Sequence, residues 1–97
     1  MCQGFRFTLG KLVIALGAKA VLQLAYGFEA VVYAIELARR HSNNDSEAPA
    51  TRLAMNEQVI AMGNGTVLST YTVGKVLIYV ETFLGSGRTT IRLPLED

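Results

Sequence analysis

The sequence predicts an α+β fold: an antiparallel sheet of three to four strands packed against two to three helices. Two observations carry this prediction. Apolar residues recur at three- and four-residue spacing between residues 18 and 62, which is typical of helices. After residue 66, apolar and polar residues alternate in runs separated by glycine, which is typical of strands joined by turns. The 97 residues fit one domain, residues 1–97.

The N-terminal segment is predicted to contribute a strand to this sheet. Residues 5–9 alternate large apolar with polar side chains, and residues 12–14 form a second short candidate strand. A helix is expected from Ala18 onward. Gly27 should end it, because glycine adopts the left-handed C-terminal conformation at little cost.

Two further helices are expected in the middle of the chain. Residues 28–41 should form the first, with an inward face of Val31, Ala34, Ile35 and Ala38. Residues 51–62 should form the second, with an inward face of Met55, Val59 and Met62. The polar residues 42–49 between these helices are typical of a loop.

The C-terminal third is predicted to be a meander of three antiparallel strands at residues 67–73, 76–83 and 89–95. Gly74-Lys75 suits a tight hairpin with glycine at its first central position. In the last strand one face is apolar, and the other carries Arg88, Thr90 and Arg92. That alternation indicates a sheet with one buried face and one face open to water or a partner.

Charge and composition narrow the classes of partner. The formal net charge is +1, which argues against bulk electrostatic binding of nucleic acid. Hydrophobic residues make up 51% of the chain, and a small domain with this excess favours self-association, so a homodimer is expected. The single cysteine, Cys2, does not allow an intramolecular disulfide.

The apolar stretch from residue 12 to residue 38 raises the question of a membrane span. Lys19, Glu29 and Glu36 interrupt it, whereas a span needs about 20 consecutive apolar residues with few charges. We therefore expect a cytoplasmic protein with no membrane partner.

No motif predicts an enzyme. The sequence offers no nucleophile elbow, phosphate-binding loop or metal-ligand spacing, so we expect no catalytic residue, cofactor or metal. His41 is the only histidine, and its position at a helix end suggests a structural role through the helix dipole. Asn56 and Glu57 are interpreted as a polar pair that braces the loop at residues 43–46.

Candidate interaction residues come from the polar helix end and the open sheet face. Arg88 and Arg92 would form a positive stripe with Arg6 and Lys11 if the N-terminal strand pairs with the last one. An aromatic residue among such cations is how single-stranded nucleic acid is often bound, although a solvated face has the same composition. The full candidate set is Arg39, Arg40, His41, Asp45, Tyr79, Glu81, Arg88 and Arg92.

Short motifs follow one another in a defined order along the chain. They are Phe7-Thr8-Leu9-Gly10, Gly17-Ala18, Arg40-His41, Asn56-Glu57, Leu68-Ser69-Thr70-Tyr71, and Glu81 ahead of Thr89-Thr90-Ile91-Arg92-Leu93-Pro94. In this order they resemble an uncharacterised family of small plasmid-related bacterial proteins found on plasmids and integrative elements. The resemblance covers roughly residues 5–96 and implies an accessory role on a mobile genetic element.

The chain departs from that family pattern at three places. Where the family has Gly-Asp-Trp-Gly, this chain has residues 44–47, and only Asp45 matches. A family tryptophan near Leu77 is absent, and an acidic, arginine-containing turn after Glu81 is replaced by residues 82–87. If the family binds a partner through these segments, the resemblance implies that this member has changed or lost it.

Two hypotheses about function follow. The first is a non-enzymatic accessory or regulatory protein of a mobile genetic element that acts through protein–protein interaction, including inhibition of a host system. The alternative is a nucleic-acid-associated regulator that uses the basic sheet face.

Overall fold

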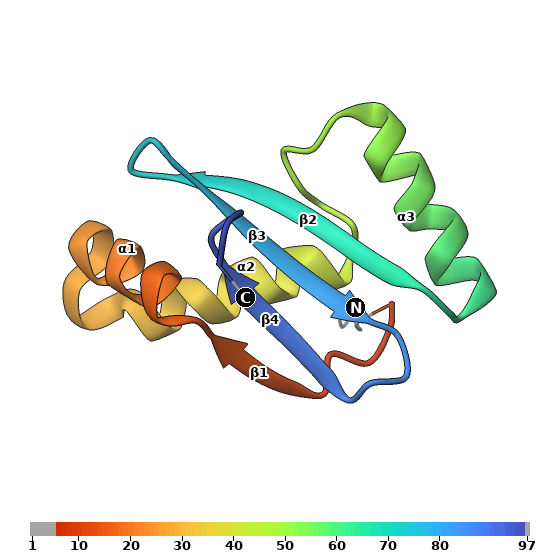
Figure 1. The fold of residues 1–97 in the computed structure, drawn as a ribbon, viewed down its shortest axis with the longest axis horizontal. Helices are drawn as coiled ribbons and strands as arrows, with labels where there is room; N and C mark the ends of the chain where they lie inside the picture. Colours follow the sequence, from red (N-terminus) through yellow and green to blue (C-terminus); the bar gives the residue numbers. More distant parts are fainter. Residues whose placement is uncertain (1–5, 97) are drawn as a thin grey trace, which may run out of the picture.

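The computed structural model describes residues 6–96 and confirms the α+β class (Figure 1). The chain forms a four-stranded sheet with helices along one face and one edge. In chain order the elements are β1 (Lys11–Ile14), α1 (Leu16–Tyr26), a 3₁₀ turn η1 (Gly27–Glu29), α2 (Ala30–Ser42), α3 (Ala50–Met62), β2 (Thr66–Val73), β3 (Val76–Phe83) and β4 (Arg88–Arg92).

The sheet is mixed, with the strand order β1-β4-β3-β2. The predicted meander is confirmed, because β2–β3 and β3–β4 are antiparallel. The hairpin at Gly74-Lys75 is also confirmed, and both of its central residues have positive φ. The prediction of a wholly antiparallel sheet was wrong at one strand, since β1 runs parallel to β4. The helices α1, α2 and α3 separate β1 from β2 and bring the chain to the opposite edge of the sheet. The last strand of the meander, β4, therefore lies beside β1 and runs in the same direction as β1.

The predicted strand at residues 5–9 is not a strand in its described part, residues 6–9; Phe5 lies outside the described residues. The amide of Arg6 donates to the carbonyl of Ser42 at the end of α2. The ring of Phe7 packs edge-on against His41 with 5.3 Å between ring centroids. The alternation that suggested a strand therefore reflects packing against α2, and the N-terminal strand begins at residue 11.

Gly10 allows the chain to enter β1 through a close approach to the turn before β4. Its φ is +66°, and a Cβ at this position would lie 2.3 Å from the carbonyl carbon and oxygen of Gly87. No side chain fits in that space, because the contact is with backbone atoms that the β1–β4 pairing holds in place.

We predict that Gly10→Ala lowers the free energy of unfolding by about 2 kcal/mol, as measured by chemical denaturation. The matched control is Gly85→Ala, which also has positive φ but would meet no atom within 4 Å. The control should lose only the backbone contribution, about 1 kcal/mol. Equal losses in the two variants would show that the approach to Gly87 is not tight.

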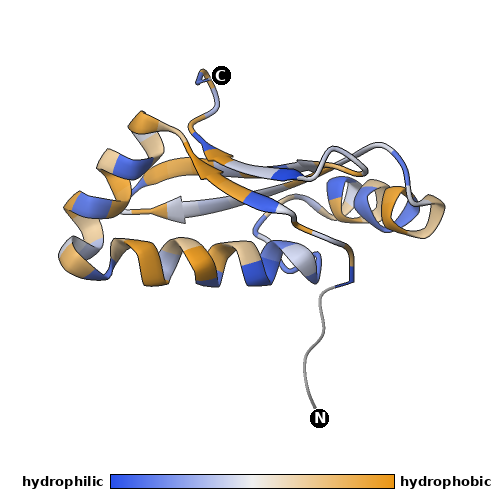
Figure 2. Cartoon of the chain, turned by 90° about the horizontal axis from the view of Figure 1, so that it is seen from below, coloured by the Kyte–Doolittle hydropathy of each residue, from blue (hydrophilic) through white to orange (hydrophobic). Residues whose placement is uncertain are grey.

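The core lies between the sheet and α2, which runs beneath it in Figure 2, with α1 at one end. Alternate residues of β2, β3 and β4 face this core. The largest buried apolar contributors are Leu22, Val67, Tyr71, Ile78, Val80 and Ile91. Small residues, Ala30, Ala34 and Ala38, form the face of α2 that allows the helix to lie close to the strands.

The predicted inward face of α2 was therefore wrong for two residues. Val31 and Ile35 are exposed, whereas Leu37 and His41 are buried in their place. Both flanks of this helix carry apolar residues, and the alanine flank is the one that fits against the sheet.

The predicted inward face of α3 was also largely wrong. Met55 and Met62 are exposed, and only Val59 of that set is partly buried. The helix lies along the edge strand β2 (Figure 1), and its single fully buried residue is Asn56. A polar contact, described below, attaches this helix to the sheet.

The last strand ends at Arg92, three residues earlier than predicted, and Leu95 is exposed. The guanidinium of Arg92 donates to the carbonyls of Leu93, Pro94 and Glu96, so the chain curls around it instead of continuing the strand. The carboxylate of Glu96 in turn accepts hydrogen bonds from backbone amides in the first turn of α1.

Candidate interaction surfaces

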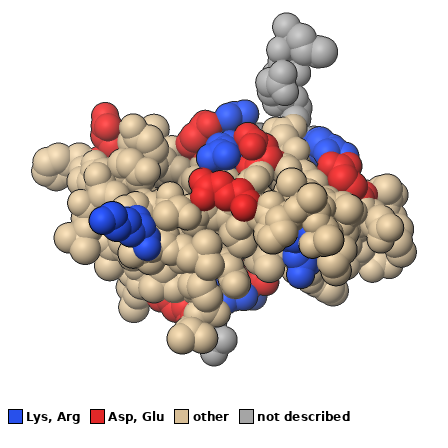
Figure 3. Space-filling view, turned by 90° about the horizontal axis from the view of Figure 1, so that it is seen from above, with Lys and Arg blue, Asp and Glu red and all other residues tan. Residues whose placement is uncertain are grey.

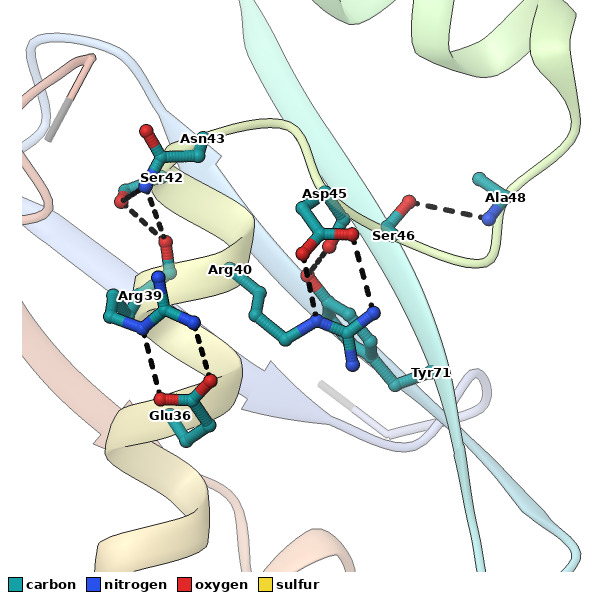
Figure 4. Close-up of polar contacts among 9 residues, drawn as sticks. All are labelled: Glu36, Arg39, Arg40, Ser42, Asn43, Asp45, Ser46, Ala48 and Tyr71. Atoms are coloured by element: carbon teal, nitrogen blue, oxygen red, sulfur yellow. Dashed lines mark hydrogen bonds and ion pairs between the residues drawn. The ribbon is translucent and has the colours of Figure 1, made fainter. Parts of the chain in front are cut away.

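The C-terminal end of α2 brings three candidate residues together, as Figure 4 shows. Arg39 donates two hydrogen bonds to the carboxylate of Glu36, at 2.9 and 2.5 Å, which lower the pKa of Glu36. Arg40 donates to both oxygens of Asp45, at 3.1 and 3.3 Å, and lies over the ring of Tyr71. Both arginines are thus occupied by carboxylates of the same molecule.

The loop at residues 43–46 is braced by Asn56 and Glu57, as predicted. The Nδ2 of Asn56 donates to the Oδ1 of Asn44 at 2.9 Å, and the Nδ2 of Asn44 donates to Glu57 at 3.0 Å. Arg6 donates two hydrogen bonds to the same Glu57 carboxylate, at 2.7 and 2.6 Å. These bonds, those from Arg6 first, lower the pKa of Glu57 to about 2. The brace therefore also anchors the start of the described chain.

Asn56 has a second role that the sequence did not reveal, because it covers the edge of the sheet. Its side chain donates to the carbonyl of Leu68 at 2.8 Å and accepts from the Leu68 amide at 3.2 Å. Glu47 continues this cover through its amide, which donates to the carbonyl of Thr70, and its carboxylate, which accepts from the amide of Thr72. Hydrogen bonds from Asn56 and Glu47 thus occupy outward-facing backbone groups of Leu68, Thr70 and Thr72. This cover protects the edge of β2 from pairing with another strand.

His41 is fully buried and belongs to a chain of hydrogen bonds under the sheet. Its Nδ1 lies 2.7 Å from the hydroxyl of Ser69, and its Nε2 lies 2.9 Å from the hydroxyl of Thr82. The Thr82 hydroxyl lies 2.6 Å from that of Thr89, which donates to the carbonyl of Leu9.

The donor and acceptor roles in this series of hydrogen bonds follow from its last acceptor, the carbonyl of Leu9. Because a carbonyl can only accept, Thr89 donates to Leu9, so it must accept from Thr82. Thr82 then accepts from Nε2–H of His41, and Ser69 donates to Nδ1. This arrangement suits the neutral imidazole, and burial lowers the pKa of His41 to about 4.

The interpretation of His41 through the helix dipole was therefore wrong in its mechanism, because a neutral ring carries no charge to interact with the dipole. Its structural role comes from the hydroxyls instead. Ser69, Thr82 and Thr89 occupy inward positions of three strands, where a core would otherwise hold apolar residues. Their positions in the strand alternation are the one sequence signal that indicates this network.

The open face of the sheet holds part of the predicted basic stripe. Lys11 and Arg88 are partners in the β1–β4 register, and Tyr79 and Arg92 are partners in the β3–β4 register. Arg92 donates to Glu81 at 2.6 Å and lies over the ring of Tyr79.

Arg6 is not part of that stripe, because it binds Glu57 on α3. Within residues 6–96, Lys11 and Arg88 are the two stripe cations that form no ion pair. Figure 3 shows the same mixing of signs elsewhere on the surface, where acidic and basic side chains lie side by side with uncharged surface around them.

A different surface lies on the exposed flank of α2. Val31, Val32 and Ile35 of α2 are exposed there, and Phe28 of the preceding turn η1 extends the same apolar surface at spacings of three, four and seven; we call these four residues the α2 seam. Their exposed fractions, in this order, are 62%, 64%, 57% and 109%. Residues at this spacing lie on one side of a helix. The sequence pattern does not reveal the α2 seam, because it predicts Val31 and Ile35 in the core.

By length and composition alone, the helical run Leu16–Ser42 is long and apolar enough to cross a membrane, among the described residues. In the structure this run bends at Gly27, whose φ is +60°, and divides into α1 and α2. Both helices contribute buried residues to the core beneath the sheet.

The described residues hold no group of three or more histidine, cysteine, aspartate or glutamate side chains that could hold a metal ion. No family model, curated protein or solved structure matches this chain. The surfaces described above are therefore the basis for the functional argument.

Proposed function

We propose that this chain is a non-enzymatic accessory or regulatory protein that acts by binding another protein through the α2 seam. The observation that carries the proposal is the exposure of three apolar side chains on one flank of α2 together with Phe28 in the turn η1 before it. Contiguous exposed apolar surface commonly marks a protein-binding site. The family resemblance adds to the proposal that the protein acts on a mobile genetic element and that its target belongs to a host system.

The charged groups support a protein partner over a nucleic acid. Of the four arginines that a nucleic-acid regulator would use, Arg39, Arg40 and Arg92 bind carboxylates within the molecule. Phosphate binding would compete with these bonds, least at the exposed Arg39 and most at Arg92, whose side chain is 18% exposed. The alternative function retains Lys11 and Arg88 on the open sheet face, at the other end of β4 from Arg92 and its register partner Tyr79, and it requires affinity that falls as salt rises.

The test is quantitative affinity enrichment from cell extract with the wild type and a Val32→Glu/Ile35→Glu double variant. At least one protein, with untagged copies of this chain counted among the candidates, should be enriched by the wild type. Docking of an apolar surface would bury the two introduced carboxylates at a cost in free energy. The double variant should therefore show roughly one-tenth of the wild-type enrichment or less.

The control variant is Met62→Glu, which places the same charge at another exposed apolar residue, on α3. It should enrich the same proteins as the wild type. Circular dichroism should show equal helix content in all three proteins, because each substituted side chain is exposed. Identical enrichment by the wild type and the double variant would refute the proposed function.

A further inference from the structure

We infer that the partner seated on the α2 seam is a second copy of this chain, with the two α2 helices packed antiparallel about a two-fold axis. The inference rests on the proposed function, and it names the occupant of the same surface. Two features of the described residues support it: the spacing of the seam and the charges at its two ends.

The spacing of the α2 seam suits self-packing. A two-fold interface uses the same patch on both copies, so the patch must be complementary to itself. In an antiparallel pair centred between Val32 and Ile35, Val32 of one copy meets Ile35 of the other. Phe28 then lies opposite Arg39, whose aliphatic stem and guanidinium can cover the ring.

The charges at the ends of the seam select the antiparallel direction. Glu29 is exposed at the N-terminal end of α2, and Arg39 is half-exposed near the C-terminal end. In the same register Glu29 of one copy is level with Ala38 of the other, one residue from Arg39, so opposite charges come close twice per dimer. Parallel packing would place like charges together at both ends, and it would also align the two helix dipoles unfavourably.

The bond between Arg39 and Glu36 does not prevent this contact. Their side chains are 43% and 48% exposed, and an exposed ion pair contributes little to stability. Arg39 can therefore turn toward a second carboxylate while it remains close to Glu36.

A lipid surface fits the α2 seam less well. Interfacial helices usually carry lysine and arginine along their polar flanks, whereas this flank has Glu29 and Glu36 as well as the two arginines. Insertion across a bilayer would also require the bend at Gly27 to straighten and α2 to leave the core.

The first experiment is size-exclusion chromatography with light scattering over a range of protein concentrations. The wild type and Met62→Glu should form a dimer as concentration rises. The Val32→Glu/Ile35→Glu variant should remain a folded monomer, with dimerisation weakened at least about tenfold.

The second experiment tests the direction of packing by charge exchange. Glu29→Arg and Arg39→Glu should each weaken the dimer by roughly threefold or more, because each leaves like charges at both ends of the pair. The combined Glu29→Arg/Arg39→Glu variant should recover most of the wild-type affinity. A combined variant that is weaker than either single variant would contradict the antiparallel arrangement.

Two outcomes would overturn the inference. The first is a wild type that stays monomeric at every concentration. If affinity enrichment then finds another protein that binds through the α2 seam, the proposed function holds, but the partner is not a second copy. The second is a monomeric wild type that co-floats with anionic vesicles while the Val32→Glu/Ile35→Glu variant does not. This result would show that the α2 seam binds a lipid surface.

Discussion

Replacement of Asn56 by alanine is expected to lower the free energy of unfolding by about 3 kcal/mol, one of the two largest effects that the structure predicts. The side chain is fully buried and makes hydrogen bonds to three groups. Its removal leaves the amide and carbonyl of Leu68 and the Oδ1 of Asn44 without this partner. Chemical denaturation measures the loss.

Hydrogen exchange provides a second readout for the same variant. The Leu68 amide should exchange faster in Asn56→Ala, since its bond to Oδ1 is gone and the β2 edge is uncovered there. Gln58→Ala is the matched control, because Gln58 is exposed on the same helix and should leave both stability and exchange nearly unchanged. If Asn56→Ala is as stable as Gln58→Ala, Asn56 does not attach α3 to the sheet.

Acidification from pH 7 to pH 4.5 is expected to lower the free energy of unfolding by roughly 2–3 kcal/mol through His41. Its pKa is about 4 in the folded chain and near 6.5 when the chain is unfolded. Between these values the unfolded state binds more protons, so stability falls as pH falls. The window ends at 4.5 because carboxylates with lowered pKa values, such as Glu57, contribute mainly below it.

The control for this effect is His41→Gln, which does not titrate. Its amide can donate to Thr82 and accept from Ser69 in place of the imidazole. The variant should have lower stability at pH 7 and a much flatter profile between pH 7 and pH 4.5. A wild-type profile that is equally flat would mean that His41 is not held neutral by burial.

Much of the fold could be predicted because its elements carry local signals. The β2–β3 hairpin follows from alternation on both sides of Gly74, and the helices follow from their apolar spacing. The N-terminal segment was misplaced because alternation alone does not say what a side chain packs against. Phe7 lies against His41, a contact between residues distant in sequence.

The candidate surfaces were predictable only in part. The brace formed by Asn56 and Glu57 was predicted, since buried or loop-facing polar groups need partners. Arg6 was misassigned, because its partner Glu57 lies 51 residues away. The α2 seam was missed because both flanks of the helix are apolar, and the choice between them depends on how closely the alanines approach the sheet.

The most direct test of the central claim, that a second copy binds the α2 seam, is a methyl NMR dilution series. The chain has five isoleucines, of which Ile35 lies in the seam and Ile78 in the core. With isoleucine methyl labelling, we predict that the Ile35 signal shifts or broadens as concentration rises, while that of Ile78 stays constant. An Ile35 signal that does not change with concentration would contradict the claim.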